Sequence, residues 1–384
     1  MREVSLPNDW ELKKISEIGE IISGGTPSTE NENYWNGDIH WIVPAELADL
    51  ESNYVESTQR TITEQGLKSS SANLLPAGTV LLTTRATVGE CAIAKIQLAT
   101  NQGFQSIKCN DNDDNLFILY SIRHNKQKFV RLAQGTTFLE INKSNVGKVE
   151  LPFPKKKQER KKISSILASV DTTLEQTKNI IKKNQRIKKG LMQKLLTESN
   201  HFTKVDNFLK INMGQSPPSD SYNKNRIGLP FLQGVTDFGE IYPNYITWCS
   251  NPKKIAGKNQ ILFSVRAPVG DINITKSKCC IGRGIASLDP GENNLFYCYY
   301  LLNQNKNRFL AFSKGTTYDA INKDEILCTE LPFTKDKKKQ QQIASILFSV
   351  DNKILTEKQN YEKLSKLQKG LMEDLLTPTL RVNI

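Results

Sequence analysis

Apolar residues recur at intervals of three and four along two long stretches of the chain, residues 155–197 and 335–377. The seam positions are Ile163, Leu167, Val170, Leu174, Ile181 and Leu191 in the first stretch, and Ile343, Leu347, Val350, Ile354, Tyr361 and Leu371 in the second. This spacing is sustained over about four heptads and therefore predicts a long helix with a coiled-coil face in each stretch. The polar residue Asn184 interrupts the first seam.

A helix with a single apolar stripe cannot bury that stripe alone. The helix over 335–377 is the obvious partner of the helix over 155–197. Because the chain passes through a second globular segment between the two helices, an antiparallel pair related by a pseudo-two-fold axis is the economical arrangement. Gly190 and Gly370 recur in the two helices and are open to two interpretations: points of close helix approach, or tolerated helical glycines.

The segments that precede the two helices have the mixed pattern of α/β domains. Residues 78–94 and 259–275 are rich in Val, Ile and Thr and contain a glycine turn, which predicts strand–turn–strand. Residues 115–135 and 294–315 predict helices that each end at a glycine. We therefore predict an α/β fold of the mixed α+β type, in which two similar α/β domains alternate with two long helices.

The second half of the chain repeats the first half. "GTTFLEINKSNV" returns 180 residues later as "GTTYDAINKDEI", "ISSILASVD" as "IASILFSVD", and "GLMQKLLT" as "GLMEDLLT". Upstream, Arg85 matches Arg266, and "SGGTPS" matches "GQSPPS" with a longer offset. Each copy thus has a variable front and a fixed back. The resulting segments are 1–152, the first variable domain; 153–198, the central helix; 199–333, the second variable domain; and 334–384, the C-terminal helix.

A net charge of +12 points first to nucleic acid as a partner. The excess lies mainly on the first helix, where residues 155–197 hold 13 Lys and Arg against 3 Asp and Glu, while the sequence outside both helices has 30 basic and 31 acidic residues. A basic helix face is often only solvated, so a DNA-binding face on the fronts must come from local clusters. The candidate DNA-binding residues are Arg85, Arg123, Lys126, Lys143, Lys224, Arg226, Arg266, Lys306, Arg308 and Lys323.

The sequence offers few residues for catalysis. It contains no phosphate-binding P-loop, no GxGxxG motif after a strand, and no evident catalytic triad or pair of carboxylates. "SPPS" resembles an amino-methyltransferase tetrapeptide but lacks its final aromatic residue, so we interpret it as a turn. Three scattered histidines and seven cysteines without a CxxC pair define no zinc site. We expect a binding protein that has no catalytic, metal-binding or cofactor-binding residues of its own.

No apolar run is long enough to span a bilayer or to serve as a secretion signal, so we expect a cytoplasmic protein with reduced thiols and no membrane partner. The adjacent Cys279 and Cys280 are open to two interpretations, a redox pair or two small, partly buried residues.

The doubled motifs "GTTxxxINK", "LPF" before a basic helix start, "ILxSVD" and "KGLMxxLLT" resemble the specificity subunit of type I restriction–modification systems over essentially the whole chain. The resemblance implies that each variable domain is a target recognition domain, which reads one half of a bipartite, asymmetric site in double-stranded DNA. It also implies that the helices set the distance between these domains and dock two methyltransferase subunits, which bind S-adenosylmethionine. Restriction subunits, which are motor nucleases, would then join, and the chain itself would be non-catalytic.

The helix start departs from the family pattern, which usually shows Glu-Gln after the "LPF" proline. The first copy has Gln158 and Glu159 in the reversed order, and the second copy has three consecutive glutamines. Three alternatives stay open beside the type I interpretation. They are the specificity component of a related type II restriction–modification system, a non-enzymatic coiled-coil adaptor, and a methyltransferase or nuclease whose motifs are not evident.

Two basic positions recur in both copies although the fronts differ. Arg85 matches Arg266, and Lys143 matches Lys323. Contacts to phosphate, which every DNA sequence shares, would explain this recurrence. A structural role in the loop would explain it as well.

Overall fold

The computed structural model describes residues 6–134, 139–197, 201–313 and 320–383. The chain forms two compact units, and each is described by itself. The first unit holds residues 1–179 and 359–384, and the second unit holds residues 180–358. These two units differ from the segments that the repeated motifs define. Each unit contains one variable front together with one half of each long helix.

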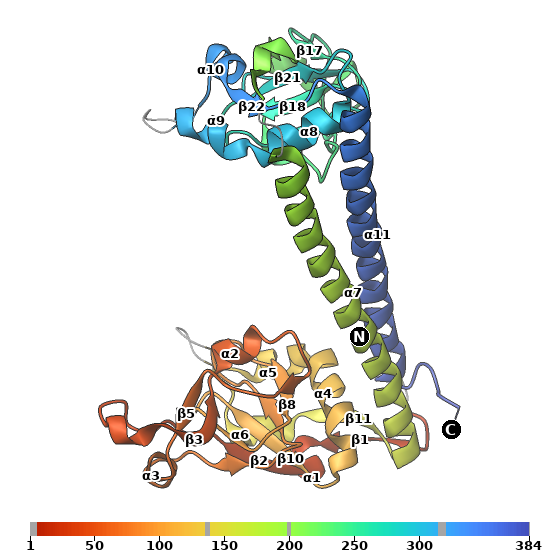
Figure 1. The fold of residues 1–384 in the computed structure, drawn as a ribbon. Helices are drawn as coiled ribbons and strands as arrows, with labels where there is room; N and C mark the ends of the chain where they lie inside the picture. The colour runs from red at the N-terminus through yellow and green to blue at the C-terminus, as the bar shows by residue number, and fades with distance from the viewer. Residues whose placement is uncertain (1–5, 135–138, 198–200, 314–319, 384) are drawn as a thin grey trace. The chain divides into compact units, whose positions relative to one another are not determined.

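The described β-structure of the first unit consists of two sheets and a short antiparallel pair (Figure 1). One sheet has the strand order β2–β10–β7–β8–β4, the other has β5–β3–β9–β6, and β1 pairs with β11. The strands are β1 (Trp10–Lys14), β2 (Gly19–Ser23), β3 (Trp35–Ile42), β4 (Tyr54–Val55), β5 (Arg60–Ile62), β6 (Leu74–Leu75), β7 (Val80–Leu82), β8 (Cys91–Ala94), β9 (Leu98–Thr100), β10 (Gln105–Cys109) and β11 (Glu150–Pro154). Because β1 and β11 are the first and last strands of this front, the front begins and ends beside the start of the long helix.

Strand β7 explains why a short apolar run predicts a buried strand here. Val80 and Leu82 lie in a core that includes the helix side of the sheet, whereas Leu81 lies in the core between the two sheets. A strand that is covered on both faces needs apolar residues at consecutive positions. The helices of this unit's front are α1 (Ile15–Ile18), α2 (Pro44–Ala48), α3 (Glu64–Lys68), α4 (Asn115–His124), α5 (Lys126–Leu132) and α6 (Lys143–Lys148), with 3-10 turns at Glu32–Tyr34 and Asn112–Asp114.

The second unit repeats this plan with different strand lengths and connections. Its sheets have the orders β13–β21–β18–β19 and β14–β16–β15–β20–β17, and β12 pairs with β22. The strands are β12 (Phe202–Lys204), β13 (Lys210–Met213), β14 (Tyr222–Asn223), β15 (Leu229–Leu232), β16 (Thr247–Cys249), β17 (Ile255–Ala256), β18 (Ile261–Ser264), β19 (Ile272–Ile274), β20 (Cys279–Ile281), β21 (Ile285–Asp289) and β22 (Glu330–Pro332). The helices of this front are α8 (Leu295–Gln304), α9 (Lys306–Ser313) and α10 (Lys323–Cys328), with 3-10 turns at Val205–Asn207, Ser219–Ser221 and Val235–Asp237.

The two long helices are α7 (Lys157–Thr197) and α11 (Lys337–Leu375), and in each unit they lie side by side (Figure 1). In the first unit, Leu167 shares a core with Leu375, and Asp171 contacts Gln368 further along, so the helices are antiparallel there. In the second unit, Lys188 pairs with Asp351, and Leu196 further along α7 shares a core with Ile343, so the helices are antiparallel there too. The prediction of mixed α/β domains combined with a pair of long packed helices is confirmed.

The predicted seam is buried to different depths along the pair. Ile163, Leu167, Leu174, Ile343, Leu347 and Ile354 are buried, while Val170, Ile181, Leu191, Val350, Tyr361 and Leu371 are half-buried. Sequence periodicity missed three residues that contribute to the cores of the units: Met192, Leu196 and Leu376. Thr177 and Asn184 are also buried in α7, so the middle of the seam is polar.

The predicted single helices over 115–135 and 294–315 are wrong. Each is broken into two helices, at Asn125 between α4 and α5 and at Asn305 between α8 and α9. The side-chain amide of each asparagine donates a hydrogen bond to the carbonyl four residues back, at 2.9 Å in both units, and so competes with the helical backbone bonds. The glycines predicted to end these helices, and the Thr-Thr that follows them, lie outside the described residues.

Two further questions from the sequence are answered by the structure. A Cβ added at Gly190 or Gly370 would meet no atom within 4 Å, so these are exposed helical glycines and not points of close helix approach. Cys279 and Cys280 are both buried free thiols on opposite faces of β20, each in a different core. Within the described ranges, no helix is long and apolar enough to cross a membrane.

Candidate nucleic-acid interface and its junction with the long helices

The hairpin turn that follows β7 in the first unit and β18 in the second is closed by equivalent hydrogen bonds. The hydroxyl of Thr83 accepts from the backbone N–H of Glu90 at 3.1 Å, and the hydroxyl of Ser264 accepts from the N–H of Asp271 at 3.2 Å. Each hydroxyl also donates to a backbone carbonyl four residues later. A short hydroxyl side chain at this position therefore fixes the shape of the turn in both units.

The turn presents one exposed arginine in each unit, Arg85 and Arg266. The Arg85 guanidinium lies 3.2 Å from the carboxylate of Glu140, and both side chains are about half exposed, so this ion pair is weak. Arg266 lines a cavity of about 250 Å³ together with Arg283. Both arginines can therefore turn toward an anionic partner at little cost.

The repeated Ile-Asn-Lys sequence at 141–143 and 321–323 has a structural part and an exposed part. Its isoleucine is buried in both copies. Its asparagine caps the helix that follows by accepting a hydrogen bond from the N–H three residues later, at 2.8 Å before α6 and 2.9 Å before α10. The lysine, Lys143 or Lys323, is exposed and forms no hydrogen bond or ion pair with a described residue. The capping explains why the loop is repeated, and it leaves the lysine free for a partner.

Two of the predicted DNA-binding lysines are engaged within their own units. Lys126 forms an ion pair with Glu90, and Lys306 forms the equivalent pair with Asp271. Each pair fastens the first turn of α5 or α9 to the hairpin turn. These lysines recur because they brace the hairpin, which makes them less suited to hold phosphate.

Arg123 and Arg308 also have partners inside the protein. Arg123 donates to the side-chain oxygen of Asn53 at 2.5 Å and to a backbone carbonyl of β8 at 3.0 Å. Arg308 donates to Asn305 at 3.2 Å, and its guanidinium lies 5.0 Å from the ring centre of Phe202. The geometry therefore assigns Arg123 a structural position, although sequence composition alone made it a DNA-binding candidate.

Lys224 and Arg226 lie in the loop between β14 and β15 and are exposed. The guanidinium of Arg226 lies 5.5 Å from the ring centre of Trp248. This contact orients the arginine without neutralising it. The loop therefore stays a candidate for contacting DNA.

The first contact between each front and its long helix is made at the start of the helix. Arg160 of α7 is buried and donates to the carboxylate of Asp114 at 2.6 and 2.9 Å. At the equivalent position of α11, Gln340 accepts from the backbone N–H of Asn294 at 2.9 Å. The charged pair of the first unit is thus replaced by an uncharged pair in the second. The departure from the family pattern at the helix start changes the chemistry of this contact but keeps the contact itself.

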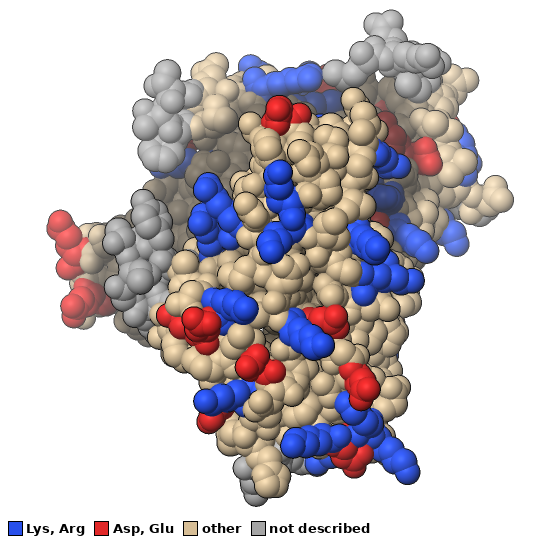
Figure 2. Space-filling view, turned by 90° about the horizontal axis from the view of Figure 1, so that it is seen from above, with Lys and Arg blue, Asp and Glu red and all other residues tan. Residues whose placement is uncertain are grey.

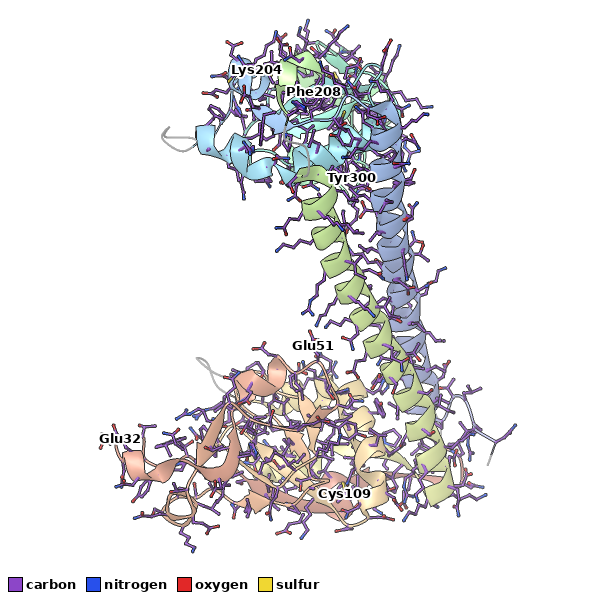
Figure 3. The ribbon with its side chains drawn as sticks, in the orientation of Figure 1. Glu32, Glu51, Cys109, Lys204, Phe208 and Tyr300 are labelled. Carbon is purple, nitrogen blue, oxygen red and sulfur yellow. The ribbon has the colours of Figure 1, made fainter. Side chains whose placement is uncertain are left out.

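The second contact joins a tyrosine of the front to the aspartate of the "SVD" motif. The hydroxyl of Tyr120 donates to Asp171 at 2.6 Å, and the hydroxyl of Tyr300 donates to Asp351 at 2.7 Å. Figure 3 marks Tyr300 where α8 meets the long helices of its unit. Burial, reinforced by the aspartate acceptor, raises the pKa of both tyrosines, so both hydroxyls remain donors. Sequence analysis missed this pair, although both residues recur with the 180-residue offset.

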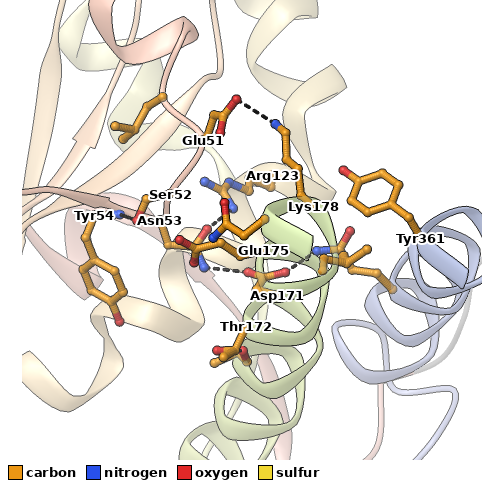
Figure 4. Close-up of a pocket in the computed structure, with 15 residues that line it drawn as sticks. Glu51, Ser52, Asn53, Tyr54, Arg123, Asp171, Thr172, Glu175, Lys178 and Tyr361 are labelled. Carbon is orange, nitrogen blue, oxygen red and sulfur yellow. Dashed lines mark hydrogen bonds and ion pairs between the residues drawn. The ribbon is translucent and has the colours of Figure 1, made fainter. Parts of the chain in front are cut away.

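The third contact lies about two helical turns further along each long helix. Lys178 of α7 is 2.8 Å from Glu51, in the loop before β4 (Figure 4), and Lys358 of α11 forms an ion pair with Glu240. These lysines are equivalent in the repeat, but the glutamates come from loops of different length. Exposed ion pairs contribute little stability. Their repetition shows that both fronts are attached to the same positions of their helices.

A cavity of about 390 Å³ adjoins these contacts in the first unit (Figure 4). Its wall includes Arg123, Asp171, Lys178, Tyr361 and Gln368. Asp171 also accepts hydrogen bonds from Gln368 and Asn53, as the dashed lines show. Because these charged groups are bonded to other residues of the wall, we interpret the cavity as a polar joint between front and helices.

Lysine and arginine side chains are dispersed among aspartate and glutamate over the face shown in Figure 2. No single basic patch covers that face. Among the described residues, no group of three or more His, Cys, Asp and Glu side chains is arranged to hold a metal ion. Readout of a partner would therefore depend on a few exposed loop residues.

Comparison with known proteins gives a consistent result. The model of the family described as the type I restriction modification DNA specificity domain matches residues 7–185 and again residues 198–366. A putative type I restriction enzyme MjaX specificity subunit from Methanocaldococcus jannaschii is 30% identical, with 98% of this chain and 95% of that protein covered. The MjaIX specificity subunit of the same organism is 28% identical over the same shares of the two chains.

Among solved structures, the S subunit of a type I restriction–modification system from M. genitalium shares the fold. Its TM-score is 0.69 at 16% identity, and the match covers 98% of this chain and 99% of that one. The two copies of the family domain also coincide with the two halves of the internal repeat. The chain therefore belongs to the family of type I restriction–modification DNA specificity proteins.

Proposed function

We propose that this chain is the non-catalytic, DNA-reading subunit of a type I restriction–modification assembly. Each front reads one half of a bipartite, asymmetric site in double-stranded DNA, and the pair α7–α11 sets the spacing between the halves. The observation that carries this proposal is the pattern of repetition. The contacts that attach a front to the long helices are present twice, whereas the exposed loops of the two fronts differ.

Phosphate contacts in this proposal come from basic residues that the fold leaves exposed and lightly engaged. They are Arg85, Lys143, Lys224, Arg226, Arg266 and Lys323. Contacts of this kind position a protein on the duplex without reading its sequence. The recurrence of Arg85 as Arg266 and of Lys143 as Lys323 fits that role, because both half-sites share the same backbone.

The helices also carry a surface suited to two copies of one partner. Ile187 of α7 and Leu367 of α11 are exposed apolar residues at equivalent positions of the repeat, with side chains 43% and 51% exposed. Each is followed three residues later by an exposed glycine, Gly190 or Gly370. A surface that is present twice in one chain accommodates two identical subunits. We assign these surfaces to two methyltransferase subunits, which supply S-adenosylmethionine binding, and restriction subunits join this core.

Native mass spectrometry of the chain co-expressed with its methyltransferase tests this assignment. The expected assembly contains two methyltransferases per chain. Ile187→Glu or Leu367→Glu should each reduce the number to one, because a charge on the apolar surface blocks one of two equivalent sites. Leu355→Glu is the matched control, since Leu355 is similarly exposed on α11 but the equivalent position of α7 is a glutamate.

A chain that forms no complex with the methyltransferase would contradict the proposed function. A chain that forms a complex whose composition is the same in all three variants would contradict the assignment of the two surfaces.

A further inference from the structure

The segments between β9 and β10 and between β20 and β21 each expose one side chain at an equivalent position. In the first unit it is Gln102, and in the second it is Arg283. Each is followed by a buried glycine, Gly103 or Gly284, where an added Cβ would come within 2.7 or 2.5 Å of a neighbouring atom. The backbone is therefore fixed by close packing in both units. Only the side chain before the glycine is free to differ.

This position lies directly beside the exposed hairpin arginine. The N–H of Thr84 donates to the carbonyl of Gly103 at 2.7 Å, and the N–H of Val265 donates to the carbonyl of Gly284 at 3.0 Å. Thr84 and Val265 are the residues immediately before the hairpin arginines. The same backbone bond thus places a recurring arginine next to a residue that differs between the units.

The motifs "SGGTPS" and "GQSPPS" enclose the position from the other side. In the first unit, the hydroxyl of Thr26 donates to the side-chain oxygen of Gln102. In the second, the N–H of Arg283 donates to the hydroxyl of Ser216 at 3.3 Å, and the Arg283 guanidinium forms no hydrogen bond or ion pair with a described residue. This explains the recurrence of these motifs, because each provides a hydroxyl that contacts the variable residue, at its side chain in the first unit and at its backbone N–H in the second.

The chemistry of the two side chains matches base readout. Glutamine pairs with adenine through N6 and N7, and arginine pairs with guanine through O6 and N7, each in a bidentate manner in the major groove. We propose that residues 102 and 283 are equivalent base-reading positions, with Gln102 contacting an adenine in one half-site and Arg283 a guanine in the other. The adjacent Arg85 and Arg266 hold the backbone of the same half-site. This inference rests on the proposed function and names the residues that carry its specificity.

The test exchanges the two side chains, each for the one found in the other front. Complexes of the methyltransferase with the wild type, Gln102→Arg, Arg283→Gln or Arg283→Ala are expressed in cells, and their methylated motifs are determined by sequencing. Arg283→Gln should lose its preference for guanine at one base pair of one half-site by about 5- to 150-fold, the range expected for one bidentate contact. Gln102→Arg should alter one base pair of the other half-site. The remaining bases and the gap should not change.

Lys278→Gln provides a matched control. Lys278 is exposed just before β20, whereas Arg283 lies just beyond its end, so Lys278→Gln should leave the motif unchanged. The position is not a base reader if Arg283→Gln and Arg283→Ala both retain the wild-type motif and methylation rate. The position is also not a base reader if Arg283→Gln and Arg283→Ala both lower methylation equally for every DNA sequence. A wild-type complex that methylates no defined motif would instead contradict the proposed function, and this inference with it.

Discussion

Replacing Tyr300 with phenylalanine removes one hydroxyl from the junction of the second unit and leaves the ring in place. In the native chain, this hydroxyl donates to Asp351 at 2.7 Å, and both residues are buried. A hydrogen bond to a charged group contributes about 1.5–3 kcal/mol to stability. Asp351 keeps its ion pair with Lys188 at 2.6 Å, so the carboxylate is not left without a partner. We therefore expect a loss of free energy of unfolding within this range.

For a unit of this size, a loss of 1 kcal/mol lowers the melting temperature by about 2–4 °C, so Tyr300→Phe should lower it by about 3–12 °C. Hydrogen exchange followed by mass spectrometry distinguishes the two units, and peptides of the first unit serve as an internal reference. Tyr361→Phe is the matched control, because the hydroxyl of Tyr361 forms no hydrogen bond with a described residue. If Tyr300→Phe destabilised the second unit no more than Tyr361→Phe destabilises the first, the assigned role of the tyrosine–aspartate contact would be refuted.

Three further predictions follow from burial and pairing. At pH 8, iodoacetamide should modify Cys328 in the native chain and the other six cysteines only after unfolding, because those six are buried and burial raises the pKa of most of their thiols. Arg160→Gln alone should destabilise the first unit by about 3–5 kcal/mol in urea unfolding, and adding Asp114→Asn should recover most of this loss, since the second unit uses an uncharged pair there. Leu347→Ala should cost about 2–5 kcal/mol, whereas Leu355→Ala, at an exposed position, should have little effect on the melting temperature.

The long helices and the internal repeat could be predicted because both are patterns that can be seen along the sequence itself. The apolar spacing around Leu167 and Leu347 and the constant offset of the motifs need no knowledge of distant contacts. The sequence predicts the polar middle of the α7–α11 pair only in part. Asn184 was recognised as an interruption, but Thr177 was not, because a buried threonine has no periodic signature.

The junctions could not be predicted in the same way. Tyr120 lies 51 residues from Asp171, and only the folded chain shows that the hydroxyl of one meets the carboxylate of the other. Their recurrence as Tyr300 and Asp351 was visible in the sequence, but recurrence alone does not distinguish a contact from a common core position. The helix break at Asn125 was missed because an asparagine within an apolar pattern is compatible with a continuous helix.

Some of the candidate DNA-binding residues have partners inside the protein that the sequence does not reveal. Sequence composition shows where basic residues lie but not whether an acidic residue already neutralises them. Lys126 is engaged by Glu90, whereas Lys143 is exposed without a described partner, and nothing in the local sequence distinguishes the two. Gln102 is absent from the candidate DNA-binding residues because it is uncharged and lies outside the basic clusters of the sequence.

The central claim is that the two fronts read separate half-sites while the helices alone set their spacing. The most direct test replaces residues 199–333 with the corresponding front of a relative and determines the methylated motif in the complex with the methyltransferase. One half-site should change to that of the donor, while the other half-site and the gap remain those of the wild type. A replacement that altered both half-sites together, or that altered the gap, would contradict this account.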